Sequence, residues 1–149
     1  MPIVMLSFLA FANVLVGAPS VTDGDSLRLR DSRIRLEGID APEIDQTCQL
    51  DGETWECGDA AADALRQLIG SRYVRCKISG KDRYDRSLAT CWVDDLEINR
   101  WMVKSGWALA YRRYSEAYVD YEDQAREAER GLWQSEFITP WSWRYARRR

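Results

Sequence analysis

The order in which strand-like and helical segments follow one another constrains this chain most. Up to about Glu43 the sequence consists of brief apolar-alternating runs, of which Ser26–Leu29 (SLRL) and 33–36 (RIRL) are the clearest. Alternation with a period of two is typical of strands with one buried face, and the intervening Asp31-Ser32 suits a hairpin turn. Because a helix, two more strands and then further helices follow, we predict an α+β domain built around a small β-barrel.

The remaining elements are predicted from periodicity and from the glycines that end helical patterns. The predicted helices are 59–69, 96–105 and 116–130. The other predicted strands are 13–16, 20–22, 73–78 and 87–93, with a short extended piece at 108–111. In the last helix, four residues recur at helical spacing and are expected to face the core: Tyr118, Tyr121, Ala125 and Ala128. Pro140 is expected to limit regular structure in the tail, 138–149.

Length and charge restrict the classes of function. A chain of 149 residues with 46% hydrophobic residues suits one domain with its own core. Its formal net charge of −3 excludes nucleic-acid binding through a broad basic surface, so any such role requires a local site, where a bound cation can reverse the sign. Histidine is absent, which excludes histidine-centred catalysis and histidine metal ligands.

The first twelve residues, MPIVMLSFLAFA, carry no charge and are typical of a signal-peptide core. Ala10-Phe11-Ala12 provides small residues for cleavage before Asn13, and the run is too short to span a bilayer comfortably. We therefore predict a signal peptide at 1–12, a mature domain at 13–149, and export to the periplasm or outside the cell. An uncleaved membrane anchor and a buried N-terminal strand are the alternatives.

Four cysteines in a small exported chain predict two disulfides, and the sequence alone allows three pairings. We favour Cys48–Cys57, which closes the short loop carrying Asp51-Gly52, and Cys76–Cys91, whose two predicted strands can lie side by side. A zinc site is disfavoured because the spacings are not CxxC and no histidine is available.

Three charged clusters are candidates for a site: 23–26 (DGDS), 33–43 (RIRLEGIDAPE) and 82–86 (DRYDR). Asp25 follows a tight-turn glycine and Asp40 ends a strand, and carboxylates are natural ligands of Ca²⁺ or Mg²⁺. Taken singly, each aspartate also has an ordinary explanation as a turn or loop residue. Glu43 lies on a proline-stiffened loop that can aim it at a water beside the metal, and Arg35 suits a phosphate because its planar fork makes two charge-assisted hydrogen bonds.

In this order and at these separations, the clusters resemble the staphylococcal nuclease (thermonuclease) family. The resemblance continues through GWALAY to GLW, and the cysteine pattern and PWSWR ending resemble its exported bacterial branch. It implies an OB-fold five-stranded β-barrel with three helices. It also implies a Ca²⁺-dependent endonuclease that hydrolyses the 5′ O–P bond of DNA and RNA and leaves 3′-phosphates.

The resemblance implies a role for each matching residue. The Ca²⁺ ligands would be the side chains of Asp25 and Asp40 and the backbone carbonyl of Ala41. The catalytic groups would be Glu43, which positions or deprotonates the attacking water, and Arg35 and Arg86, which hold the phosphate and stabilise the transition state. Substrate would be bound by Arg83, Tyr84 and Tyr111. The expected substrate is preferentially single-stranded, and the expected protein is a monomer without a stable protein partner.

Three positions depart from the family pattern. Ser26 and Ala41 stand where the family often has threonine, but Ser26 keeps a hydroxyl and Ala41 keeps its carbonyl. Asp85 replaces the glycine that usually precedes the catalytic arginine. Its carboxylate would pair with Arg86 or repel the phosphate, so we expect weakened activity.

Two other classes of function compete with the enzyme. The first is a non-catalytic OB-fold module that binds nucleic acid or protein. It is disfavoured because all five active-site positions hold the right residue types: Asp25, Arg35, Asp40, Glu43 and Arg86. The second is a structural cell-envelope protein that uses only the barrel and the disulfides. That hypothesis gives no role to Asp25, Asp40 and Glu43.

Overall fold

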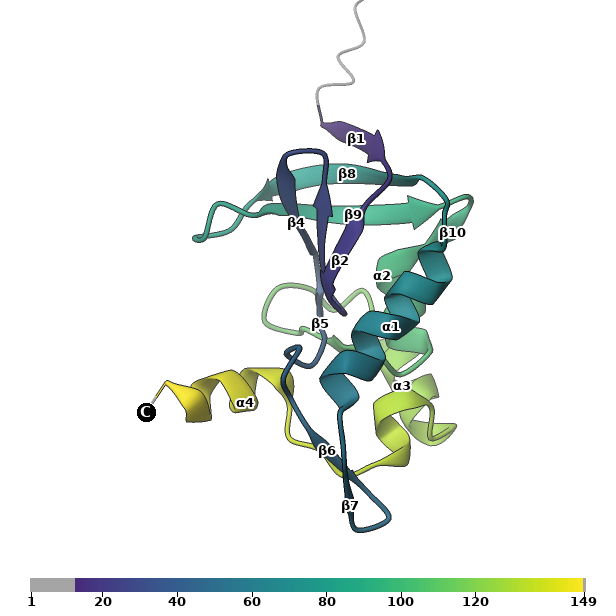
Figure 1. Ribbon diagram of the computed structural model, residues 1–149, viewed down its shortest axis with the longest axis vertical. Helices are drawn as coiled ribbons and strands as arrows, with labels where there is room; N and C mark the ends of the chain where they lie inside the picture. The colour runs from purple at the N-terminus through teal and green to yellow at the C-terminus, as the bar shows by residue number, and fades with distance from the viewer. Residues whose placement is uncertain (1–12, 149) are drawn as a thin grey trace, which may run out of the picture.

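The computed structural model describes residues 13–148 and has a mixed α+β fold, which confirms the predicted class (Figure 1). The strands are β1 Val14–Gly17, β2 Ser20–Asp23, β3 Ser26–Leu29, β4 Ser32–Leu36, β5 Ile39–Asp40, β6 Cys48–Leu50, β7 Glu53–Trp55, β8 Val74–Lys81, β9 Ser87–Val93, β10 Leu96–Glu97 and β11 Leu109–Ala110. The helices are α1 Cys57–Ile69, α2 Ile98–Lys104, α3 Val119–Glu127 and α4 Pro140–Arg147, with a 3₁₀ turn at Gly131–Gln134.

The main sheet is seven-stranded, with the order β1-β8-β9-β4-β3-β2 and β10 paired to β9. The β4–β9 pair is parallel and its neighbours are antiparallel. In Figure 1, β8 and β9 run across the direction of β2 and β4, so the sheet is strongly curled. Leaving aside the edge strands β1 and β10 gives the five strands expected of the barrel.

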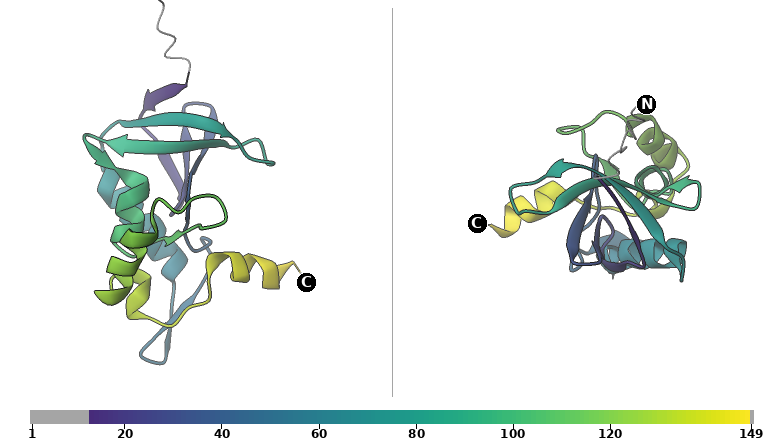
Figure 2. Two further views of the ribbon diagram at one scale, coloured as in Figure 1. Left: turned by 180° about the vertical axis from the view of Figure 1, so that it is seen from behind. Right: turned by 90° about the horizontal axis from the view of Figure 1, so that it is seen from above.

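The strand alternation buries one face of the sheet. Leu27, Leu29, Ile34 and Leu36 point into the core and are almost fully buried. The α1 helix presents a stripe of small and apolar side chains, including Leu65, to the same core, and α2 packs against β9. Each such leucine contributes about 1.5–3 kcal/mol on burial. Figure 2 shows α1, α2 and α3 gathered on one side of the molecule, with α4 standing apart.

Both predicted disulfides are confirmed. Cys48–Cys57 joins β6 to the start of α1 with a Cα–Cα distance of 5.7 Å. Between its cysteines β6 and β7 form a hairpin whose turn, Asp51-Gly52, has φ angles of 52° and 80°. Cys76–Cys91 joins directly paired residues of β8 and β9. Both bonds rule out a zinc site at these cysteines.

The C-terminal expectations need correction. Pro140 does not limit regular structure but begins α4, because proline is well suited to the first position of a helix and Thr139 accepts a hydrogen bond from the Ser142 N–H at 3.2 Å. The predicted helix 116–130 is shorter, at Val119–Glu127. Ala128 therefore lies beyond its end and is exposed.

The predicted signal peptide, 1–12, lies outside the described residues. Within residues 13–148, no helix has the length and apolar character needed to cross a membrane.

Candidate active site

The residues named from the sequence meet around a single groove of about 960 Å³ between the β8–β9 hairpin, the Glu43 loop and α4. Its walls include seven of them: Asp25, Arg35, Glu43, Arg83, Tyr84, Arg86 and Tyr111. Asp40 and Ala41 lie buried behind the wall. The groove also contains Asp23 of the first cluster, and residues to which the sequence analysis gave no role: Arg113, Tyr114, Trp141, Arg144 and Arg148.

The DGD turn before β3 places Asp25 against Ala41. A Cβ atom on Gly24 would lie 2.8 Å from the Ala41 Cβ, so this close approach requires glycine. Asp25 Oδ2 accepts the Ala41 N–H at 2.7 Å, and Asp25 Oδ1 accepts the Ser26 hydroxyl at 2.9 Å. The hydroxyl that Ser26 retains thus orients the carboxylate.

The Glu43 loop is fixed through its backbone, and its side chain lies at the groove. A Cβ atom on Gly58 would lie 1.8 Å from the Glu43 carbonyl oxygen, so the first turn of α1 must be bare where the loop crosses it. Gln46, which is buried, accepts the Glu43 N–H at 3.2 Å and donates to the Ile138 carbonyl at 2.9 Å. The Glu43 side chain remains 34% exposed.

Arg35 lies between the two aspartates. Its Nη1 is 3.3 Å from Asp25 Oδ2 and its Nη2 is 3.3 Å from Asp40 Oδ1. Nη1 also donates to the carbonyls of Leu36 and Ile39, both at 2.9 Å. These contacts leave the side chain 11% exposed, so Arg35 is a fixed part of the site.

Arg144 of α4 approaches Asp40 more closely than Arg35 does, and sequence reasoning missed it. Its Nη1 and Nη2 donate to Asp40 Oδ1 and Oδ2, each at 2.8 Å, and Nη1 also donates to Glu43 Oε1 at 2.9 Å. Asp40 is 0% exposed, so this is a bidentate, desolvated ion pair. The available signal was the arginine of PWSWR, to which no role had been given.

Burial and mutual repulsion shift the pKa values of the aspartates. Burial alone would raise the pKa of Asp25, but Arg35 and the hydrogen bonds to its carboxylate outweigh it and hold the pKa below its usual value. Burial and the charge of Asp25 raise the pKa of Asp23. Burial raises the pKa of Asp40 to about 6, although the hydrogen bonds from Arg144 oppose the shift.

The site has an excess of carboxylates, which favours a cation. Four acids, Asp23, Asp25, Asp40 and Glu43, face two guanidiniums, those of Arg35 and Arg144. With Asp23 protonated at neutral pH, as its raised pKa of about 9 implies, the other three carboxylates exceed the two guanidiniums by one charge, which a bound cation would offset. Within residues 13–148, no three His, Cys, Asp or Glu side chains are grouped so as to hold a metal by themselves. A cation here would therefore need a backbone oxygen and water in addition to two carboxylates.

Arg86 faces the groove from the β8–β9 turn, where it pairs with Asp82 and not with Asp25, Asp40 or Glu43. Its Nε donates to Asp82 Oδ2 at 2.7 Å, while Asp82 Oδ1 accepts the N–H groups of Tyr84 and Arg86 at 2.9 Å. Asp85 adopts a φ of 62° and pairs with Lys81 at 3.1 Å. Its carboxylate therefore pairs with Lys81 and not with Arg86.

Comparison with known proteins adds an independent observation. The family described as staphylococcal nuclease homologue matches residues 33–135, well over half of the chain. The chain belongs to the staphylococcal nuclease family. It is 35% identical over 130 residues to the succinoglycan biosynthesis protein ExoI of Rhizobium meliloti (strain 1021), covering 84% of this chain and 68% of that protein.

Two further relatives carry nuclease names. An uncharacterized endonuclease of Escherichia coli O157:H7 is 33% identical over 133 residues, which cover 84% of this chain and 81% of the relative. The probable staphylococcal-like nuclease CAN2 of Oryza sativa subsp. japonica is 32% identical over 123 residues, which cover 80% of this chain and 31% of the relative.

In this member of the staphylococcal nuclease family, the two candidate tyrosines differ in how accessible their rings are. Tyr84 is 47% exposed, and the guanidiniums of Arg83 and Arg86 lie 4.9 and 5.5 Å from its ring centroid. Tyr111 stacks on Trp141 with centroids 5.5 Å apart and meets Tyr114 edge-on at 5.0 Å. Tyr84 is therefore the more open surface for a base.

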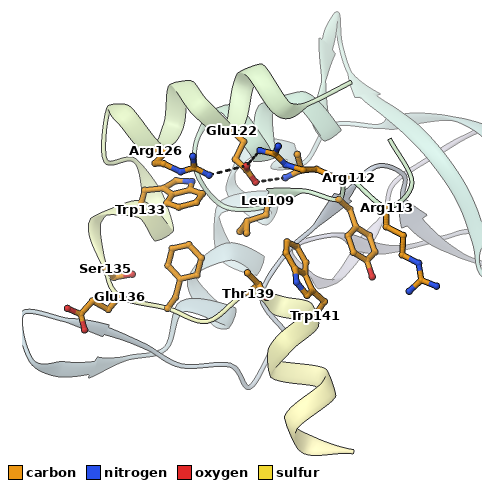
Figure 3. A pocket seen from close by; sticks show the side chains of 13 residues that line it. Leu109, Arg112, Arg113, Glu122, Arg126, Trp133, Ser135, Glu136, Thr139 and Trp141 are labelled. Carbon is orange, nitrogen blue, oxygen red and sulfur yellow. Dashed lines mark hydrogen bonds and ion pairs between the residues drawn. The ribbon is translucent and has the colours of Figure 1, made fainter. Parts of the chain in front are cut away.

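Tyr111 and Trp141 line both the groove and a second, aromatic pocket of about 860 Å³. Figure 3 shows this second pocket. Trp133 and Phe137 line this pocket, and Arg112 and Arg126 at its upper side pair with Glu122 at 3.0 and 3.4 Å. Trp141 belongs to α4, so the C-terminal helix forms part of the wall of both cavities.

Proposed function

We propose that this chain is a Ca²⁺-dependent endonuclease that hydrolyses the 5′ O–P bond of DNA and RNA and leaves 3′-phosphates. Membership of the family and the nuclease names of its relatives support nuclease activity. The observation that carries the proposal is the buried Asp25–Arg35–Asp40 arrangement with Glu43 at its rim, facing one groove with Arg86 and Tyr84.

The donor set suits a hard cation. The carboxylates of Asp25 and Asp40 and the carbonyl of Ala41 would hold Ca²⁺, since oxygen ligands, flexible geometry and retained waters are what this ion accepts. The excess of negative charge in the cluster supports this assignment. When bound, the ion would offset the negative charge that grows on the phosphate during the reaction.

The protein's own groups divide the remaining work. Glu43 takes a proton from the attacking water as the water oxygen bonds to phosphorus and the P–O5′ bond breaks, and O5′ takes a proton from solvent water to leave as the 5′-hydroxyl. Arg35 donates hydrogen bonds to the phosphate oxygens, where charge accumulates in the transition state. Arg86 does the same after exchanging Asp82 for the phosphate. In a protein without histidine, Glu43 offers a carboxylate that is 34% exposed on the groove and can reach a water there.

Substrate form and location are also part of the proposal. Arg83, Tyr84 and Tyr111 bind the nucleotide beside the scissile phosphate, and aromatic stacking favours single strands of any sequence. The domain at 13–149 acts as a monomer without a stable protein partner after loss of 1–12, in the periplasm or outside the cell. The two disulfides support export because such bonds persist in oxidising compartments.

A gel assay separates this proposal from the binding-module alternative. The proposed nuclease shortens a labelled single-stranded oligonucleotide only when Ca²⁺ is present. A binding module retards the same oligonucleotide without shortening it, with Ca²⁺ or with a chelator.

Replacing Asp85 by glycine is expected to raise kcat/KM about fivefold. The substitution removes a negative charge beside the phosphate-binding Arg86 and restores a residue suited to the φ of 62°. Two nearby charges that are fully solvated interact by about 1 kcal/mol, which corresponds to about fivefold in rate. Asp94→Gly is the matched control, because Asp94 is an exposed turn aspartate with a φ of 51° that pairs with Arg72. Steady-state kinetics on a short oligonucleotide measure the effect. Equal kinetics for Asp85→Gly and wild type would show that Asp85 does not restrain the reaction.

A further inference from the structure

We propose that Arg144 is an internal counter-cation of the active site, so that docking of α4 through Arg144 and binding of a divalent cation oppose each other. This inference rests on the cation site of the proposed function. Arg144 is then a positioning residue, because it acts through Asp40 and Glu43.

The contacts of Arg144 coincide with the groups that a cation would need. Both oxygens of Asp40 accept a hydrogen bond from Arg144 at 2.8 Å, and Asp40 is fully buried. Ca²⁺ binds carboxylate oxygens at about 2.3–2.6 Å. An ion bound to either oxygen of Asp40 would therefore share that oxygen with a guanidinium nitrogen of Arg144. The two positive charges would repel strongly, because the site is partly desolvated.

The rest of α4 is attached by contacts that do not involve Arg144. Trp141 stacks on Tyr111, and Gln46 donates to the carbonyl of Ile138 just before the helix. Arg147, near the end of the helix, pairs with Asp45. These anchors hold α4 in place when the Arg144 side chain leaves Asp40. Because α4 projects from the body of the molecule (Figure 1), that change would not unfold the domain.

The coupling must act in both directions. If Arg144 weakens cation binding by a given factor, the cation weakens the Arg144 contact by the same factor. Since α4 lines both the groove and the aromatic pocket, loading the site with a cation would remove one of the contacts that hold α4 there, while its other anchors remain.

The test is calorimetric titration of Ca²⁺ into the wild-type protein, Arg144→Gln and Arg147→Gln. We expect Arg144→Gln to bind Ca²⁺ at least fivefold more tightly than wild type, within the usual range of such couplings. Arg147→Gln removes the same charge from the same helix without touching Asp40 or Glu43, and its affinity should stay within about twofold.

Thermal unfolding with EGTA and with Ca²⁺ distinguishes competition from a structural role. Arg144→Gln leaves buried Asp40 with fewer partners, so its Tm should fall in EGTA and recover in Ca²⁺, with a larger Ca²⁺-induced increase than in wild type. An equal fall in both conditions, or unchanged or weaker Ca²⁺ affinity in Arg144→Gln, would overturn the inference and leave the nuclease proposal standing. If neither wild type nor Arg144→Gln binds Ca²⁺, the inference falls together with the proposed cation site.

Discussion

Glu43→Gln is expected to lower kcat by about 10²- to 10⁴-fold, the usual contribution of a general base. Glutamine keeps an oxygen that can accept the Arg144 hydrogen bond seen at Glu43 Oε1, and the loop backbone is held independently by Gln46. Folding and KM should therefore change little, and the loss should fall on the chemical step. Single-turnover cleavage of a short labelled oligonucleotide at saturating enzyme measures that step directly.

Glu53→Gln is the control for this substitution, because Glu53 is an exposed glutamate in the β6–β7 hairpin, outside the groove. It should cleave at the wild-type rate. A Glu43→Gln protein that retains more than about a tenth of the wild-type rate would exclude Glu43 as the base, since general bases contribute more than this.

Arg35→Gln is expected to reduce both activity and stability. Losing one preorganised donor to the transition state costs about 10²- to 10³-fold in kcat. Arg35 also separates two buried carboxylates, and removing one partner of a buried ion pair costs about 3–5 kcal/mol in the free energy of unfolding. Urea denaturation in EGTA measures the stability, and Ca²⁺ should recover part of it by taking over the charge of the guanidinium.

Arg28→Gln provides the comparison for Arg35→Gln. Arg28 is an exposed arginine on the neighbouring strand β3, so its replacement should leave the unfolding free energy within about 0.5 kcal/mol of wild type. If Arg35→Gln were as stable as Arg28→Gln in EGTA, the aspartates would not depend on Arg35 for their charge balance.

Local patterns predicted the fold where a single segment determines its own structure. Ser87–Val93 was bounded correctly because buried and half-buried residues alternate along the whole strand, and Ser26–Leu29 because the buried Leu27 and Leu29 flank the exposed Arg28. The α4 helix was missed because Pro140 was treated as a breaker of structure, whereas Thr139 caps a helix that starts at the proline. The short strands β6 and β7 depend on each other and on the Cys48–Cys57 bond, so neither is evident from its own residues.

The site was predicted as far as its motifs reach. Asp25, Asp40 and Glu43 were named from their motifs and the family resemblance, and the structure brings them together around Arg35 and Arg144. Arg144 contacts Asp40 across 104 residues, and no local pattern shows that a helix beyond the third cluster returns to the first two. For the same reason Gln46, which connects the Glu43 loop to the segment before α4, was not recognised.

The central claim is tested most directly by digesting a 5′-labelled single-stranded DNA oligonucleotide with the purified domain 13–149, in Ca²⁺ and in EGTA, and then analysing the product ends. A Ca²⁺-dependent nuclease that leaves 3′-phosphates should cleave in Ca²⁺ only. Its labelled fragments should change mobility after phosphatase removes the 3′-phosphate. Cleavage that persists in EGTA, fragments ending in 3′-hydroxyls, or an intact oligonucleotide with a correctly folded protein would contradict it.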